Sequence, residues 1–490
     1  MLRNQRFLPG GTSITRIATA VCALFTTLPA AAASGQNGGL VSQLVRAAQM
    51  HKLAVLAVVA VLSLAIAIWL IAKRQFLLLK VCVVLGIVVV VGFGWTKFEE
   101  KYPNEKVFSL QRYKEALPIV LGNDIPLTTF EPVSVLKVHN RYITKTAYPV
   151  IDIHFHLESL PLDISPEQLV AAMDAVGVSQ IVNLGGLPGV YQQLAQKFQS
   201  KYPDRIIMFG KADISAVQRE GGIAQQVRWF DEAAGLGARG IKFSKSFGLG
   251  HRDAAGKLVA VDDIRFDPLF VEAGRLGLPV LIHTGDPTAF FEKPDNHNER
   301  YAEMLVHPEW SLYQKPGYPT KDEMMAARER LITRHPEITW IGAHMGMNDD
   351  DLDYASYMLE KYPNYNVDMS SVVHSLGRQP YTARRFFIRY QDRILFGSDG
   401  GYKLAPAGSD GWTTERMYRS YFEFLETENE YADYPQSDIT KQGHWRVYGL
   451  NLPPEVLEKI YYKNALRLLP SHEAVVARLP PASTPPAIAP

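Results

Sequence analysis

Eight short apolar runs alternate with helical patterns between residues 149 and 399, and this alternation is the strongest constraint on the fold. Strands that alternate with helices pair in parallel within one sheet. The runs that we predict to be strands are Pro149–Ile153, Gln180–Leu184, Ile206–Phe209, Gly240–Phe243, Pro279–Ile282, Thr339–Ala343, Tyr365–Met369 and Ile394–Gly397. The segments between them with helical periodicity include Pro166–Ala175, Ile223–Ala234, Pro268–Arg275, Lys321–Arg334 and Thr382–Tyr390.

The number of strands and the length of the segment together favour a closed barrel. A (β/α)8 barrel typically takes about 250 residues. An open, doubly wound sheet is the alternative, and it normally carries a glycine-rich phosphate-binding turn after its first strand. Here the first strand runs instead into residues 152–158, Asp-Ile-His-Phe-His-Leu-Glu, which contain no glycine. We therefore predict an α/β fold with a TIM-like (β/α)8 barrel, whose active site lies at the carboxyl ends of the strands.

The chain before this segment contains three further apolar stretches. The first lies within residues 1–34, follows several arginines and ends in small residues, which predicts a signal peptide or a signal anchor. The other two, Leu53–Ala72 and Phe76–Thr96, are long enough to cross a bilayer and contain almost no charge. We predict two transmembrane helices within 53–96, with buried core helices as the alternative.

Basic residues set the expected orientation of this anchor. Lys73 and Arg74 lie in the short turn between the two stretches, and such turns remain in the cytoplasm. The chain after Thr96 then emerges on the other side. The sequence thus predicts a membrane protein whose catalytic domain is extracytoplasmic, that is, periplasmic.

The rest of the chain divides into a lead-in segment at 97–148, the barrel at 149–470 and a disordered, proline-rich tail at 471–490. Lys and Arg number 51 against 50 Asp and Glu, and this net charge of +1 gives no reason to expect a nucleic acid partner. The only two cysteines, Cys22 and Cys82, lie in the apolar stretches, so the barrel has no thiolate metal site. The sequence leaves open whether the chain forms a homo-oligomer.

The first predicted strand ends in two histidines separated by one residue. Side chains alternate along a strand, so His154 and His156 point to the same side, with Asp152 in line behind them. Two neutral imidazoles that converge in this way can bind a divalent cation. The spacing also occurs by chance, so it is weak evidence by itself.

Other strands also end in polar or ionisable residues. His283, His344 and Asp399 each follow an apolar run, and Lys242 lies at the end of another. Taken singly, each has an ordinary structural explanation: a core histidine, a turn-forming aspartate or an ion-paired lysine. In a barrel, however, the carboxyl ends of all strands meet on one face, so these residues are predicted to share one site.

These segments resemble the amidohydrolase superfamily, and in particular its amidohydrolase-2 branch, which also contains metal-dependent decarboxylases. The resemblance covers about 149–470. The matching segments, in family order, are Asp152-Ile-His-Phe-His, Gly240-Ile-Lys, Ile282-His-Thr-Gly-Asp, Gly342-Ala-His-Met-Gly, Leu395-Phe-Gly-Ser-Asp and Tyr462-Lys-Asn-Ala-Leu-Arg.

The resemblance implies a barrel that binds one or two divalent metal ions. The residues that resemble metal ligands are His154, His156, His283 and Asp399. His344 resembles a histidine that faces the substrate in one-metal members and binds the second ion in two-metal members. Lys242 occupies the position of a carbamylated bridging lysine in two-metal relatives. We expect Zn²⁺, with Mn²⁺ or Fe²⁺ as alternatives, and one ion rather than two.

The expected chemistry is hydrolysis of an amide, ester or lactone-like bond in a small-molecule substrate. A Zn²⁺-type ion lowers the pKa of bound water to about 7. Asp399 would then transfer the proton from water to the leaving group, and His344 would polarise the substrate carbonyl. The alternatives are a non-oxidative carboxy-lyase on the same barrel and a binding protein without catalysis.

Loops after the strands are expected to set specificity. The insertion at 284–319 is long enough to form a lid. Its aromatic residues, which either line a pocket or hold the loop in place, are Phe290, Phe291, Tyr301 and Trp310. The residues that either meet an anionic substrate or remain surface charges are Lys245, His251, Arg252, His374 and Arg378.

Overall fold

The computed structural model describes residues 133–159, 164–401, 413–434, 443, 445–476 and 478. The chain separates into two compact units, 1–134 and 135–490, and the second contains the predicted barrel. The predicted signal segment at 1–34, the predicted transmembrane helices at 53–96 and most of the lead-in lie outside the described residues. Among the helices that are described, none has the length and apolar character needed to cross a bilayer.

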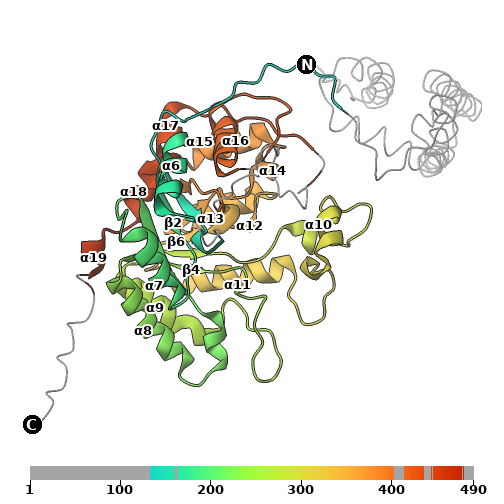
Figure 1. Cartoon of the computed structure of the whole chain (residues 1–490). Helices are drawn as coiled ribbons and strands as arrows, with labels where there is room; N and C mark the ends of the chain where they lie inside the picture. The colour runs from blue at the N-terminus through green and yellow to red at the C-terminus, as the bar shows by residue number, and fades with distance from the viewer. Residues whose placement is uncertain are drawn as a thin grey trace, which may run out of the picture. The chain divides into compact units, whose positions relative to one another are not determined.

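Eight parallel strands follow one another around the barrel in sequence order. Figure 1 shows β2, β4 and β6 at the centre of the barrel unit, with helices around them. Backbone hydrogen bonds join the last strand to the first, since Ile153 N donates to Phe396 O (3.0 Å) and Asp399 N donates to His154 O (2.8 Å). The predicted α/β barrel is therefore confirmed. Its strands are β1 Val150–Phe155, β2 Val178–Asn183, β3 Ile206–Lys211, β4 Ala238–Phe243, β5 Val280–Ile282, β6 Trp340–Gly342, β7 Tyr365–Asp368 and β8 Ile394–Leu395.

Some of the main helices begin at a side-chain cap. Ser165 accepts a hydrogen bond from Gln168 N at the start of α6, and Thr320 does the same for Glu323 N at the start of α11. All five predicted helices are confirmed to within a few residues. The helices are α6 Pro166–Val176, α7 Val190–Leu194, α8 Gly222–Gly235, α9 Asp267–Leu276, α10 Tyr301–Val306, α11 Lys321–Arg334, α12 Ala343–Met347, α13 Leu352–Lys361, α14 Val373–Leu376, α15 Pro380–Arg389, α16 Thr414–Glu426, α17 Pro454–Glu458, α18 Asn464–Leu468 and α19 His472–Val476.

Alternate residues of the strands belong to two separate apolar clusters. On β3, Ile207 and Phe209 pack with residues of the other strands, whereas Ile206 and Met208 pack with residues of the helices. The first cluster is the interior of the barrel and the second is the layer between strands and helices. A Cβ on Gly240 would collide with the Phe209 ring, so glycine leaves the space that this ring fills.

The ordered barrel unit extends further than we predicted. The tail was expected to begin at 471, but α19 covers His472–Val476 and Val475 is fully buried. This helix packs on α8 and β4. The apolar residues after Pro470 are sufficient for one short docked helix, and the proline-rich run after residue 478 lies outside the described residues.

Candidate metal centre

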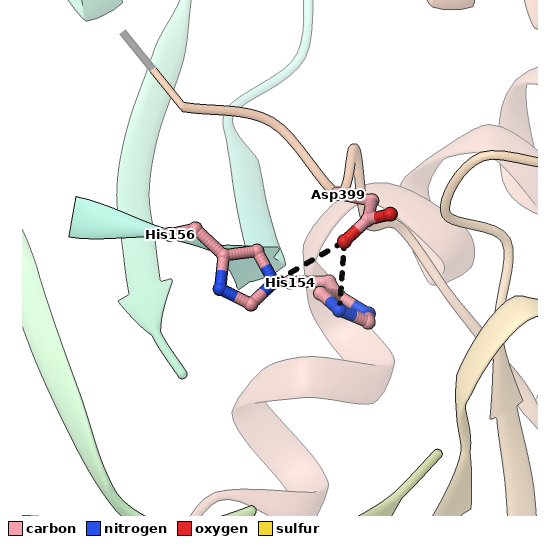
Figure 2. Close-up of side chains that lie close together, drawn as sticks. All are labelled: His154, His156 and Asp399. Atoms are coloured by element: carbon pink, nitrogen blue, oxygen red, sulfur yellow. Dashed lines mark ion pairs between the residues drawn. The ribbon is translucent and has the colours of Figure 1, made fainter. Parts of the chain in front are cut away.

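The predicted histidine pair lies at the end of β1, opposite the carboxylate that follows β8. Figure 2 shows the rings of His154 and His156 turned toward Asp399. The Nε2 atoms of the two histidines lie 3.1 Å and 3.2 Å from the same oxygen, Asp399 Oδ1. His154 is fully buried, whereas the Asp399 side chain is 32% exposed. The cluster is therefore anchored in the barrel and open at its mouth.

Asp368, at the end of β7, fixes the ring of His154. Its Oδ2 lies 2.9 Å from His154 Nδ1. Its Oδ1 accepts hydrogen bonds from His344 N (2.9 Å), Ser370 N (3.0 Å) and Ser370 Oγ (2.6 Å). Burial would raise the pKa of Asp368, but the charge and hydrogen bond of His154, with further help from His344, hold it well below the ordinary value. Asp368 is thus an ionised acceptor that keeps the His154 proton on Nδ1.

Glu158 orients the ring of His156, as Asp368 orients the ring of His154. Glu158 Oε1 lies 2.8 Å from His156 Nδ1. Burial lowers the pKa of His156, but hydrogen bonds to Asp399 and Glu158 outweigh it and raise the pKa to about 9. In the absence of a metal ion, His156 is therefore protonated, and its positive charge lies where a bound cation would be stabilised.

The tautomers imposed by these partners match a metal site. A neutral histidine that donates its Nδ1 proton carries a lone pair on Nε2. His154 and His156 would then both present lone pairs to a carboxylate oxygen, an arrangement that is repulsive unless a cation lies between them. Two imidazoles and one carboxylate oxygen are a donor set suited to a transition-metal ion. The residues present therefore fit the expected metal.

The remaining predicted residues surround this cluster. Lys242 is buried, and its Nζ lies 3.3 Å from His154 Nε2. Burial lowers the pKa of Lys242 to about 8. The ring of His344 lies 5.0 Å from that of His154 and 4.5 Å from that of His283, centroid to centroid. Burial also lowers the pKa of both His283 and His344, so these imidazoles are neutral.

Potential ligand atoms form two overlapping groups among the described residues. One group is His154, His156 and Asp399, and the other is His154, His344 and Asp368. His283 belongs to neither group and joins the cluster through its contact with the His344 ring. The structure thus brings the sequence-predicted site residues together at one end of the barrel.

Three supporting residues were not identified from the sequence: Asp368, Ser370 and Glu158. Asp368 lies inside the predicted strand Tyr365–Met369, which also contains the polar Asn366, and the apolar Met369 follows it. The pattern of an apolar run that stops at a polar residue therefore does not single out Asp368. Ser370 and Glu158 follow no such pattern, because their roles depend on partners that are distant in the sequence or on a loop.

Asp152, which strand alternation places in line behind the histidines, is fully buried. Its carboxylate accepts hydrogen bonds from His154 N (3.0 Å), Ser398 N (3.0 Å) and Tyr418 Oη (2.6 Å). Burial raises its pKa. Asp152 therefore ties β1 to the segment that carries Asp399 and to α16.

His344 lies in a strained turn. Residues 344–347, within α12, all have positive φ angles, of 56°, 55°, 66° and 58°. Three of the four are not glycine, and each such residue costs roughly 1–2 kcal/mol in this conformation. His344 Nδ1 lies 2.8 Å from the carbonyl oxygen of Ser370, so it carries the proton and leaves a lone pair on Nε2.

The charged loop residues that we considered for an anionic substrate have protein partners. Lys245 pairs with Asp286 (2.6 Å), and Arg378 pairs with Glu299 (2.7 Å) and lies over the Trp445 ring. In the 284–319 insertion, Phe290 is buried and its ring lies 5.7 Å from that of Trp310, so these aromatic residues hold the loop together.

A surface cavity of about 730 Å³ lies away from this cluster. It is lined by residues at the amino-terminal ends of β1 and β2, including Pro149, Gly177 and Arg205. None of the candidate metal-site residues lines it, so it takes no part in the metal centre.

A (β/α)8 barrel with converging histidines and aspartates at its carboxyl face defines a metal-dependent enzyme. Residues 151–471 match the amidohydrolase family, Amidohydro_2, so the chain belongs to this family, as the resemblance predicted.

Solved structures similar to this chain include an uncharacterized TIM-barrel protein from Bordetella bronchiseptica, with 18% identity, 67% coverage of this chain, 99% of the other and a TM-score of 0.40. The 5-carboxyvanillate decarboxylase of Sphingomonas paucimobilis has 14% identity, and the match covers 66% of this chain and 98% of the other with a TM-score of 0.37. The 4-oxalomesaconate hydratase of Rhodopseudomonas palustris has 16% identity, and the match covers 67% of this chain and 98% of the other with a TM-score of 0.40. A search of curated proteins found no match.

Proposed function

We propose that this chain is a metal-dependent hydrolase that cleaves an amide, ester or lactone-like bond of a small molecule. The observation that carries the proposal is the convergence of His154 Nε2 and His156 Nε2 on Asp399 Oδ1. The Nδ1 atom of each histidine is hydrogen-bonded to a carboxylate, as is usual for metal-binding histidines.

His154, His156 and Asp399 would hold the ion, and His283 would complete its coordination. A divalent cation in this place supplies Lewis acidity and lowers the pKa of bound water to about 7. Nitrogen-rich donors favour Zn²⁺, with Mn²⁺ and Fe²⁺ as alternatives. One ion is favoured because the first group of ligand atoms is the more open to solvent, while a second ion would draw on His344 and Lys242.

Asp399 is the proposed proton carrier. Burial would raise its pKa, but the charge of His154 and hydrogen bonds to both strand histidines hold it well below the ordinary value. The ionised carboxylate accepts a proton from the attacking water and delivers it to the leaving group.

His344 is the proposed partner of the substrate. Neutral His344 presents a lone pair, because its proton is directed to the Ser370 carbonyl. It therefore accepts a hydrogen bond from a donor group of the substrate, and polarisation of the substrate carbonyl by His344 would require a proton on Nε2.

The membrane anchor and the extracytoplasmic location of the barrel remain proposals that rest on the sequence of residues 1–96. Protease treatment of spheroplasts tests them. Digestion of the barrel domain in intact spheroplasts supports this location, and protection of the domain contradicts it.

Metal analysis and a product assay on the purified full chain test the enzymatic proposal. We expect about one equivalent of bound metal, loss of activity on chelation, and incorporation of ¹⁸O from labelled water into the product of an amide, ester or lactone. His154→Ala and Asp399→Ala should abolish turnover. Asp392→Ala, which removes an exposed carboxylate just before β8, is the matched control.

Two outcomes would contradict hydrolysis. Release of CO₂ from carboxylated substrates without ¹⁸O incorporation would identify a carboxy-lyase on the same barrel. A protein with no affinity for Zn²⁺, Mn²⁺ or Fe²⁺ would instead be a binding protein that has kept the fold.

A further inference from the structure

We propose that Lys321 and Arg328, on one face of α11, are positioning residues for His344 and hold its strained turn in place. This inference rests on the proposed function, in which His344 faces the substrate. The two residues are seven positions apart, or about two helical turns, so their side chains leave α11 on the same side.

Lys321 joins the loops that follow two neighbouring strands. Its Nζ donates a hydrogen bond of 2.7 Å to Met347 O, in the turn after β6. It donates a second hydrogen bond of 2.7 Å to Asp286 O, in the loop after β5. His283 and His344 lie at the starts of these two segments, and their rings are in contact at 4.5 Å. Lys321 therefore fixes the separation of the two segments that carry these histidines.

Arg328 contacts the same turn through the carbonyl oxygen of Gly346. It is 1% exposed, and its Nη1 donates a hydrogen bond to Gly346 O, which also accepts one from Asn348 Nδ2 (2.6 Å). Its Nε and Nη2 atoms have no hydrogen-bond partner in the described part of the chain. A Cβ on Gly346 would collide with the Tyr365 hydroxyl, so the turn is enclosed on this side as well.

The charge balance supports a role in the turn. Within the described residues, no carboxylate forms an ion pair with Lys321 or Arg328. Cations away from solvent are unfavourable unless they are paired or hydrogen-bonded. Here the acceptors are two backbone carbonyl oxygens of the left-handed turn, Met347 O and Gly346 O, together with Asp286 O of the neighbouring loop. The two cations thus satisfy the carbonyl end of the turn, and in return the turn presents His344 in one orientation.

The experiment reads the protonation pattern of His344 directly. In ¹⁵N-histidine-labelled full chain, with and without Zn²⁺, the fixed tautomer should give two well-separated ring-nitrogen signals, which His344→Gln assigns by their loss. In Lys321→Met we expect these signals to move toward each other as the two tautomers mix. Lys321→Arg should restore the separation, because arginine can donate to both carbonyls. Arg330→Met, which removes an outward ion pair of α11 with Asp262, is the matched control and should leave the signals unchanged.

Wild-type ring signals in a folded Lys321→Met variant would overturn the proposal, even if its thermal stability is lower. If that variant does not unfold cooperatively, Arg328→Lys decides by the same signals. The metal-free spectra test the positioning role even if the protein hydrolyses nothing, so this inference and the proposed function can fail separately.

Discussion

Asp368 orients two of the histidines of the candidate metal centre. It accepts the Nδ1 proton of His154 and two backbone hydrogen bonds, from His344 and Ser370, so one carboxylate orients two imidazoles that come from different strands. A hydrogen bond of this kind decides which ring nitrogen remains free to bind a metal ion.

Replacing this carboxylate should therefore weaken metal binding. In Asp368→Asn the amide group must direct either its oxygen or its NH₂ group toward His154, and one of the present donors loses its acceptor. We expect the affinity for Zn²⁺ to fall about 10–100-fold, as for other partners of metal-binding histidines. Competition titration with a chromophoric chelator measures it, and an unchanged affinity would remove Asp368 from this role.

Glu158→Gln provides the contrasting change at the other histidine. Glu158 has a single hydrogen bond to His156, and the glutamine oxygen can still accept the Nδ1 proton. We expect a loss of affinity smaller than in Asp368→Asn, measured by the same titration. A larger loss would mean that the charge of Glu158, and not the hydrogen bond, is what matters.

At the scale of single elements, α11 makes stability depend on pH. Burial lowers the pKa of Lys321 from 10.5 to about 8, since nearby Asp350 and Asp349 only partly compensate. Between these two values the unfolded chain binds more protons than the folded one, so stability rises with pH. This gain in the free energy of unfolding is complete above pH 10.5, and it is lost as the pH falls through 8.

The wild type should therefore gain stability relative to Lys321→Met between pH 8 and pH 10.5. Chemical denaturation of both proteins at pH 7.5 and pH 10, followed by tryptophan fluorescence, measures the difference. A difference that is the same at both pH values would show that Lys321 titrates normally.

The short helix α19 should contribute measurably to the barrel. Val475 is fully buried, whereas Leu466 on the preceding helix is 58% exposed. Val475→Ala removes two buried methyl groups and should lower the free energy of unfolding by about 1.5 kcal/mol. Leu466→Ala should have a much smaller effect. Equal effects in thermal unfolding would mean that α19 is not docked.

The sequence was sufficient to predict elements that depend on local patterns. The strands and main helices were located because their periodicity is local, and His154, His156 and Asp399 were located because they follow apolar strand segments. The turn at 344–347 was not predictable in this way. Its left-handed conformation depends on Asp368, Lys321 and Arg328, which are separate in the sequence.

At the scale of the whole molecule, the packing of the barrel interior should be sensitive to volume. Phe209 on β3 fills the space above Gly240 on β4. Gly240→Ala places a methyl group against this ring and should destabilise the barrel by about 1–3 kcal/mol. Adding Phe209→Leu should recover part of the loss in a denaturation experiment. No recovery would show that backbone strain, and not the ring, is responsible.

The closure of the barrel between β1 and β8 has a consequence for when the protein becomes active. His154 and Asp399 come from the first and last strands, and the hydrogen bond from Asp399 N to His154 O that joins them belongs to the seam itself. Until the segment after β8 has been synthesised, the nascent chain carries His154 and His156 but lacks Asp399, one of the three members of the first ligand group. We therefore expect this group of ligand atoms to assemble only after synthesis has passed Asp399.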